Sequence, residues 1–88
     1  MPAKPEVQRR LGKAVKDIRA AKAITQEELS QRTGLHTTYI SDIERGARNP
    51  SFEVLVRLAA GLDVTMAELG AAYDRRVRRG ELRPASAP

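Results

Sequence analysis

Apolar residues recur at the three- and four-residue spacing of an α-helix along nearly the whole chain. The clearest stripe, spaced by four, four and three residues, consists of Val7, Leu11, Val15 and Ile18. This spacing places the four side chains on one face of a helix, where they can pack against a neighbouring helix. The two-residue alternation typical of a strand is almost absent, so the pattern predicts an all-α fold.

Two copies of one local signal mark the starts of helices. Thr25 is followed three residues later by Glu28, and Thr65 and Glu68 repeat the same spacing. This is the spacing of a capping box, in which each side chain binds the backbone amide of the other residue. We therefore expect a second helix to open at Thr25, and a fifth to open at Thr65 and continue toward residue 80.

The other boundaries are predicted from glycine and serine. A first helix is expected over residues 6–23. Gly34 can adopt the positive φ that a tight turn between helices requires, so a third helix is expected over residues 36–45. Ser51 is expected to cap a fourth helix, whose apolar face carries Phe52, Leu55, Ala59 and Leu62. The result is a compact five-helix domain.

The residue inventory excludes most kinds of chemistry. The 88 residues include no cysteine and only 3 % aromatic side chains, so the core must be aliphatic, without disulfides or thiolate metal sites. His36, the single histidine, has no nucleophile with an orienting carboxylate beside it in the sequence. We therefore expect no enzyme, no metal and no cofactor. No apolar run has the length of a membrane span or a secretory signal, so we expect a cytoplasmic chain with no membrane partner.

Sixteen lysines and arginines against eleven aspartates and glutamates give a net charge of +5. Such a balance favours a polyanionic partner, either nucleic acid or an anionic membrane surface. The membrane alternative is disfavoured, because no strongly apolar, aromatic-flanked surface helix is present. The basic excess lies at the ends: residues 1–22 hold seven basic and two acidic groups, and residues 75–88 hold five and one.

The basic residues at the two ends allow more than one interpretation. Lys13, Lys16 and Lys22 fit the solvated face of a helix better than direct phosphate contacts. The arginines at positions 75, 76, 78 and 79 could attract DNA nonspecifically, bind an acidic partner or only keep the protein soluble. We favour nonspecific attraction to DNA.

Residues 26–46 form the most informative unit. A short capped helix, a glycine turn and a second short helix follow one another, and Leu29, Ile40 and Ile43 stand where the two helices would pack. This order predicts a helix-turn-helix. Small hydroxyl side chains near the start of the second helix suit a DNA major groove, and the free backbone amides there suit phosphates. The outward positions are Thr37, Thr38, Ser41 and Asp42, with Tyr39 at one edge.

Two of these positions leave alternatives open. Tyr39 either lines the edge of the core or presents its hydroxyl to DNA. Asp42 repels phosphates, so it either accepts a hydrogen bond from a cytosine amino group or points along the groove.

Together these residues resemble the Cro/repressor (XRE) family of helix-turn-helix DNA-binding proteins over about residues 7–70. The features at the family's spacing are Gln26, the turn glycine, the string Ile-Ser-Asp-Ile-Glu-Arg-Gly at 40–46 and Asn-Pro-Ser at 49–51, followed by Leu55, Leu58, Ala59 and Leu62. The resemblance implies the all-α, five-helix fold of phage repressors and double-stranded DNA as the partner.

The resemblance also implies roles for the matching residues. Gln26 would contact a phosphate, while Arg48 and Asn49 would grip the DNA backbone. Arg19 and Glu44 would form a structural ion pair that ties the first helix to the third. Base edges would be faced by Thr37, Thr38 and Asp42. The full set expected to bind DNA is Gln26, Thr37, Thr38, Tyr39, Ser41, Asp42, Arg48 and Asn49.

The segment from His36 to Ser51 further resembles the controller proteins of restriction-modification systems, which are small single-domain members that form dimers. Those proteins commonly carry arginine where this chain has Thr37. Arginine bound in bidentate fashion to guanine is the commonest specific base contact, and threonine cannot reproduce it. The DNA target of a controller therefore cannot be transferred to this chain.

An apolar stripe along the fifth helix suggests a second surface. Leu69, Tyr73 and Val77 extend this stripe beyond what a minimal five-helix domain needs. They either dock onto the core of their own chain or form a dimer seam. We favour the seam, because one recognition helix reads only a few base pairs and two symmetric copies double the contacts.

These observations predict a homodimeric, sequence-specific regulator of transcription, a repressor or autoregulator that binds a palindromic double-stranded operator. The alternative is an antitoxin-type module that binds both DNA and a protein partner. The expected organisation is a flexible arm at residues 1–5, a DNA-binding domain with its dimerisation helix at 6–79, and a disordered tail at 80–88.

Overall fold

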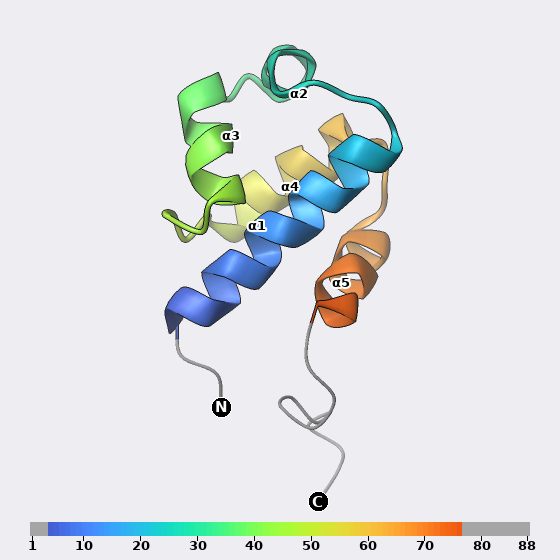
Figure 1. Cartoon of the computed structure of the whole chain (residues 1–88). Helices are drawn as coiled ribbons and strands as arrows, with labels where there is room; N and C mark the ends of the chain where they lie inside the picture. The colour runs from blue at the N-terminus through green and yellow to red at the C-terminus, as the bar shows by residue number, and fades with distance from the viewer. Residues whose placement is uncertain (1–3, 77–88) are drawn as a thin grey trace, which may run out of the picture.

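The computed structural model describes residues 4–76, which form five α-helices and no strand (Figure 1). The helices are α1 (Lys4–Ala21), α2 (Gln26–Thr33), α3 (Thr37–Glu44), α4 (Phe52–Gly61) and α5 (Met66–Arg75). The predicted all-α, five-helix fold is confirmed. Val77, residues 1–3 of the expected arm and the expected tail lie outside the described residues. Among the helices of residues 4–76, none is long and apolar enough to cross a membrane.

The longest helix, α1, runs across the molecule between α3 on one side and α5 on the other (Figure 1). It packs against both of them, while α2 packs against α3 and α4, and α4 packs against α5. The turn between α2 and α3 contains Gly34, whose φ of 78° is the predicted left-handed conformation. The pair α2–α3 is therefore the predicted helix-turn-helix, supported from behind by α1 and α4.

Both capping boxes form as predicted. The amide of Glu28 donates to Thr25 Oγ1 at 3.0 Å, and the amide of Thr25 donates to Glu28 Oε1 at 3.1 Å. Glu68 and Thr65 make the same two bonds, at 3.0 and 2.9 Å respectively. Ser51 starts α4 by accepting a hydrogen bond from the amide three residues later. These helices begin where purely local signals place them.

The first helix differs from the prediction at both ends. It begins two residues earlier, at residue 4, because Pro5 lies in the first turn, where its missing N–H costs no helical hydrogen bond. It ends at Ala21, two residues before the expected end, because Ala23 adopts a left-handed φ of 55°. The amide of Ile24 then bonds the carbonyl of Arg19 at 2.9 Å and closes the helix end.

The core is aliphatic, as predicted, and no polar residue within residues 4–76 is buried in it. Its largest fully buried side chains are Val15, Leu29, Ile40, Ile43, Leu58 and Leu62. Because Ile40 and Ile43 are both in this set, the inner face of α3 packs into the core and its outer face is turned toward solvent.

The prediction that Phe52 lies on the buried face of α4 is wrong. Its side chain is 72 % exposed, whereas Leu58 is completely buried. At about 100° per residue, Phe52 and the buried Ala59 lie only about 20° apart around the axis, so the direction in which Phe52 faces does not explain its exposure. Phe52 is the first residue of α4, and its side chain does not pack against the core, whereas Leu55 in the same helix does.

Gly12 lets α1 and α3 approach until their backbones touch. A methyl group at this position would lie 2.3 Å from the carbonyl oxygen of Ile43 and 2.6 Å from that of Glu44. Both distances are far inside van der Waals contact, so the crossing of α1 and α3 requires a residue without a side chain. This contact fixes the C-terminal end of α3 against the body of the domain.

Candidate nucleic-acid interface

The outer face of α3 carries most of the residues predicted to bind DNA. Thr38 is exposed, and four half-buried side chains surround it: Thr37, Tyr39, Ser41 and Asp42. His36 is the N-cap residue, but its side chain makes no capping hydrogen bond. The first backbone amides of α3 are thus not capped by that side chain, and such amides together with the helix dipole favour an approaching phosphate.

Asp42 is the centre of a charged cluster at the C-terminal end of this face. Its carboxylate forms ion pairs with Arg45 and with Arg48, whose Nε lies 3.4 Å from Oδ2. Arg45 also donates to Ser41 Oγ at 2.8 Å. The guanidinium of Arg48 lies over the ring of Tyr39, 5.5 Å from its centroid, a cation–π geometry.

In this cluster the negative charge of Asp42 is more than balanced by its neighbours. Two guanidiniums face one carboxylate, so the group of three carries one net positive charge. The acidic residue therefore does not make this end of α3 repel phosphates. Its two oxygens instead hold two long, flexible arginine side chains close to the outer face of the helix.

Sequence reasoning missed Arg45. Its side chain is 62 % exposed and bonds two residues of the predicted set, Ser41 and Asp42. The signal that could have found it is its spacing, since it lies three residues after Asp42 and four after Ser41, and residues three and four apart share one face of a helix.

Arg19 and Glu44 form a bidentate ion pair between α1 and α3. Arg19 Nε donates to Oε2 at 2.7 Å and Nη2 donates to Oε1 at 3.0 Å. The hydrogen bonds that Arg19 donates to the carboxylate of Glu44 are the main reason that the pKa of Arg19 is raised above its ordinary value. Arg19 Nη1 also donates to the carbonyl of Ile24 at 3.0 Å, so one guanidinium joins α1, the loop before α2 and the end of α3.

Gln26, at the start of α2, joins the same network. Its Nε2 donates to Glu44 Oε1 at 3.0 Å. An amide nitrogen carries two hydrogens, so the second one is left for a phosphate oxygen. A cleft between the starts of α2 and α3 is lined by Arg19, Thr25, Gln26, Glu27 and Thr37. The residue predicted to contact phosphate therefore lies at the mouth of a polar cleft, with its orientation set by Glu44.

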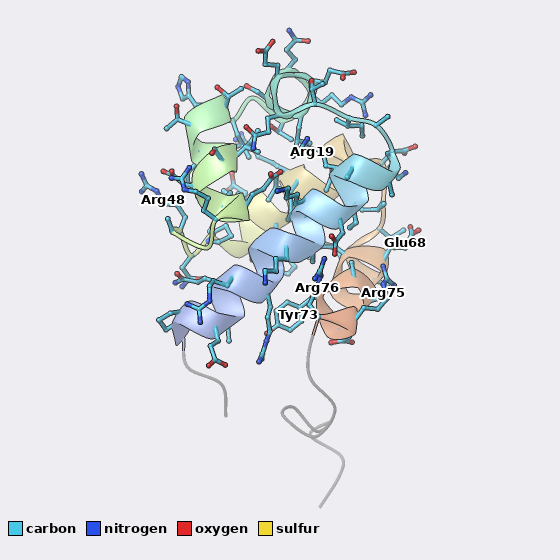
Figure 2. The ribbon with its side chains drawn as sticks, in the orientation of Figure 1. Arg19, Arg48, Glu68, Tyr73, Arg75 and Arg76 are labelled. Carbon is cyan, nitrogen blue, oxygen red and sulfur yellow. The ribbon has the colours of Figure 1, made fainter. Side chains whose placement is uncertain are left out.

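Arg48 and Asn49 lie in the loop that joins α3 to α4, and both are exposed. Figure 2 shows Arg48 beside α3, on the opposite side of α1 from Arg75 and Arg76. The predicted backbone-gripping loop is thus contiguous with the outer face of α3. Arg75 and Arg76 lie across α1 from this surface.

The α5 residues predicted to form a dimer seam are placed differently from one another. Leu69 is only 2 % exposed and packs inside the core of its own chain, so it offers no surface to a partner. This corrects the prediction for Leu69: the turn of α5 that carries it faces α1 and α4. Tyr73 is half-buried and packs against the same core. Val77 lies outside the described residues.

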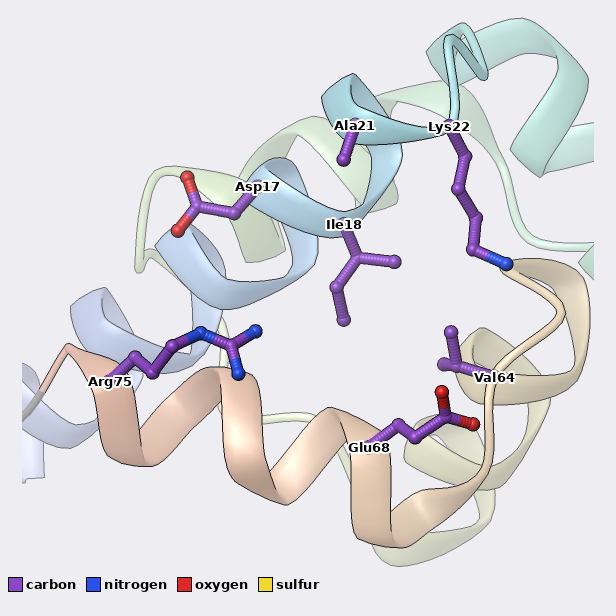
Figure 3. A pocket seen from close by; sticks show the side chains of 7 residues that line it. All are labelled: Asp17, Ile18, Ala21, Lys22, Val64, Glu68 and Arg75. Carbon is purple, nitrogen blue, oxygen red and sulfur yellow. The ribbon is translucent and has the colours of Figure 1, made fainter.

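A shallow cleft between α1 and α5 is framed by charged side chains (Figure 3). Beside it, Arg76 donates to both carboxylate oxygens of Asp17, at 2.7 and 2.6 Å. Lys22 reaches across its end and donates to the carbonyl of Asp63 at 3.0 Å. Arg76 and Lys22 therefore join α1 to the C-terminal part of the domain, and the nonspecific DNA attraction favoured for Arg76 is not needed to explain its position.

A family model described as helix-turn-helix matches residues 15–69. The control protein C.BamHI of Bacillus amyloliquefaciens is 42 % identical over 59 residues, which is 66 % of this chain and 73 % of that protein. The matched region contains the whole outer face of α3 and the Arg19–Glu44 pair.

Two solved structures are similar to this fold. The restriction-modification controller protein C.AhdI from Aeromonas hydrophila superposes with a TM-score of 0.68 at 35 % identity, covering 70 % of this chain and 94 % of that one. The controller protein C.Esp1396I, solved as a tetramer in complex with its natural 35 base-pair operator, superposes with a TM-score of 0.76 at 31 % identity, covering 80 % and 92 %. The resemblance to XRE-type helix-turn-helix proteins and to restriction-modification controllers is confirmed.

Proposed function

The chain belongs to the helix-turn-helix family that matches residues 15–69, and from this premise we propose that it is a sequence-specific, double-stranded DNA-binding regulator of transcription. One observation carries the proposal. The exposed face of α3 combines hydroxyl side chains at its start with a cluster of net positive charge at its end, while the opposite face is fully buried. Such a helix can enter a major groove and contact both base edges and phosphates.

The role that we propose for each residue follows from its position on the α2–α3 unit. Thr37 and Thr38, at the start of α3, read base edges. Arg45 and Arg48 hold the DNA backbone at its other end, together with Asn49 of the loop. Gln26 contacts a phosphate from the start of α2. The Arg19–Glu44 pair does not touch DNA but keeps the starts of α2 and α3 in register with α1.

The proposal includes a homodimer that acts as a repressor or autoregulator on a palindromic operator. It is supported by a relative solved as a tetramer on its operator. The antitoxin alternative is not favoured, because the similar proteins include several named control proteins, and others are named transcriptional regulators or a repressor. The same proposal makes the chain a cytoplasmic protein without a catalytic centre, since it must share a compartment with DNA and its site holds binding groups.

The test is selection of bound duplexes from a random DNA pool at about 150 mM salt, where exposed nonspecific contacts are substantially screened. We expect a palindrome whose half-sites are about one helical turn apart. Failure to enrich any sequence with folded protein would contradict the proposal.

Variants then test the assignment of roles. Thr37→Ala and Thr38→Ala should each weaken operator binding by about 1–3 kcal/mol and leave binding to random sequence unchanged. Equal losses on operator and random DNA, measured by anisotropy of labelled duplexes, would remove these residues from base reading.

A further inference from the structure

A strip of three cations runs along α1, formed by Arg9, Lys13 and Lys16, and all three side chains are exposed. They are spaced by four and three residues, so they share one face of the helix. None of them takes part in an ion pair within residues 4–76. Like charges at this spacing repel one another, so the α1 strip weakens its own helix as long as no anion faces it.

The carboxylates of α1 itself are already bonded to other arginines. Glu6 pairs with Arg10 at 3.3 Å. Asp17, four residues after Lys13, is bonded through both of its oxygens to Arg76, at 2.7 and 2.6 Å. The acidic residues nearest in sequence therefore do not neutralise the α1 strip, and it keeps its positive charge.

The α1 strip adjoins the loop that follows α3, which lies beside the N-terminal half of α1 (Figure 1). Gly46 comes directly after Arg45 and has a left-handed φ of 79°. A methyl group on Gly46 would lie 2.6 Å from Cγ of Arg9 and 2.9 Å from its Cα, so the two backbones are in contact. Lys16 stands one turn after Gly12, where α1 touches the end of α3. The strip is thus next to the cationic end of the proposed DNA-binding face.

We propose that the α1 strip is a second contact with the DNA backbone, in which Arg9, Lys13 and Lys16 hold phosphates adjacent to those held by Arg48 and Asn49. The interval from Arg9 to Lys16 spans about 10 Å of helix, at about 1.5 Å per residue. One strand of B-DNA carries a phosphate about every 3.4 Å along its axis, so about three phosphates match the three cations. Such contacts add affinity and fix the position of the protein without reading bases.

The structure separates Lys22 from the two other lysines that were expected on a solvated face of the first helix. Lys22 donates to the carbonyl of Asp63 at 3.0 Å and so joins two parts of the domain. Lys13 and Lys16 instead stand in line with Arg9, on the side of α1 that leads to the loop after α3. The phosphate role is therefore proposed for these two lysines and not for Lys22.

This inference rests on the proposed function, because it adds contacts to the same duplex. The test is the salt dependence of DNA binding by the full chain that carries both Lys13→Gln and Lys16→Gln. Each phosphate contact contributes about 0.9 to the slope of log affinity against log salt, so the slope should fall by about two. Binding to operator and to random-sequence duplex should weaken alike, by about tenfold or more near 150 mM salt.

A matched control removes the same number of charges elsewhere. The double variant Lys22→Gln, Arg75→Gln changes two exposed cations at the end of α1 and on α5, and its slope should equal that of the wild type. Lys13→Arg with Lys16→Arg keeps both charges of the strip and should also keep the slope. Loss of folding would not imitate these results, because removing like charges from an exposed face should leave the thermal unfolding midpoint unchanged or raise it.

Duplexes in which single phosphates are replaced by neutral methylphosphonates then locate the contact. A phosphate held by the strip is one whose replacement weakens binding of the wild type but not of the Lys13→Gln, Lys16→Gln variant. The absence of any such phosphate, or equal falls in slope for the two glutamine double variants, would overturn the proposed contact. An unchanged slope would also overturn it, and would point to an acidic protein surface as the partner of the strip.

The outcomes also separate this inference from the proposed function. A wild type that selects no DNA sequence, but whose slope on random duplex falls in the Lys13→Gln, Lys16→Gln variant, would uphold the strip and reject the sequence-specific regulator. A wild type that selects an operator and shares its slope with that variant would do the reverse.

Discussion

At the residue scale, the charge of the proposed DNA-binding face depends on Asp42. Its carboxylate lies between Arg45 and Arg48 and cancels one of their two charges. Replacing it with asparagine keeps a similar shape and one acceptor oxygen but removes the negative charge. The two guanidiniums are then free to reach phosphates and are held less firmly at the helix.

We therefore expect Asp42→Asn to bind random-sequence duplex about two- to fivefold more tightly, as one surface charge pair is worth about 0.5–1 kcal/mol. The ratio of operator to random-sequence affinity should fall, because the arginines lose their fixed positions. Anisotropy titrations of labelled duplexes measure both affinities. Asp74→Asn removes the same charge from α5 and serves as the control; equal effects from both variants would show that only net charge matters.

The capping boxes make a second prediction at this scale. The backbone hydrogen bonds from Thr25 and Thr65 lower the pKa values of Glu28 and Glu68 below the ordinary value of 4.5. A carboxyl whose pKa is lower in the folded than in the unfolded chain stabilises the fold above its unfolded pKa. That stabilisation is lost as the pH falls through the folded pKa.

The wild type should therefore lose stability below about pH 4.5 more steeply than the double variant Glu28→Gln, Glu68→Gln, in which the capping side chains do not titrate. Thermal unfolding followed by circular dichroism from about pH 7 to pH 3 gives both profiles. Parallel profiles for the two proteins would exclude the capping carboxylates as a source of acid sensitivity.

At the scale of helices, the position of α3 depends on its backbone contact with α1 at Gly12. Gly70 offers a matched comparison: it is also helical, but a methyl group there would meet nothing within 4 Å. Alanine is the better helix former by about 1 kcal/mol, so the same substitution should have opposite signs at the two sites.

Gly12→Ala should destabilise the domain by about 1–3 kcal/mol, because α1 and α3 must move apart. Gly70→Ala should stabilise it by about 0.5–1 kcal/mol. Urea unfolding followed at 222 nm measures both changes. Gly12→Ala should also weaken operator binding, because the displaced C-terminal end of α3 would move the whole helix. A Gly12→Ala variant that is more stable than the wild type would contradict the close contact.

The helices also show which features can be read from sequence. Thr25 with Glu28 predicts a helix start correctly because the interaction is contained within four residues. The end of α1 could not be predicted, because Ala23 takes a left-handed conformation that glycine usually marks. The burial of Leu69 and the exposure of Phe52 depend on which neighbour each helix packs against, and helical spacing carries no information about that.

At the scale of the whole molecule, the net charge of +5 does not by itself say which surface of the domain faces DNA. Arg76 is bonded to Asp17 on the far side of α1, and Lys22 is bonded to the loop before α5. The charge that faces DNA in the proposed complex is instead the cluster at the end of α3, with the adjoining strip on α1. Salt dependence can separate these two groups, because each phosphate contact releases condensed counterions.

Arg48→Ala should weaken binding to operator and random DNA alike and lower the slope of log affinity against log salt by about one. Arg75→Ala removes the same charge from α5, across α1 from Arg48, and should leave the slope unchanged (Figure 2). Affinities measured between about 50 and 200 mM salt give both slopes. Equal falls for the two variants would mean that the DNA follows the total charge of the domain, and the proposed face on α3 would lose its electrostatic basis.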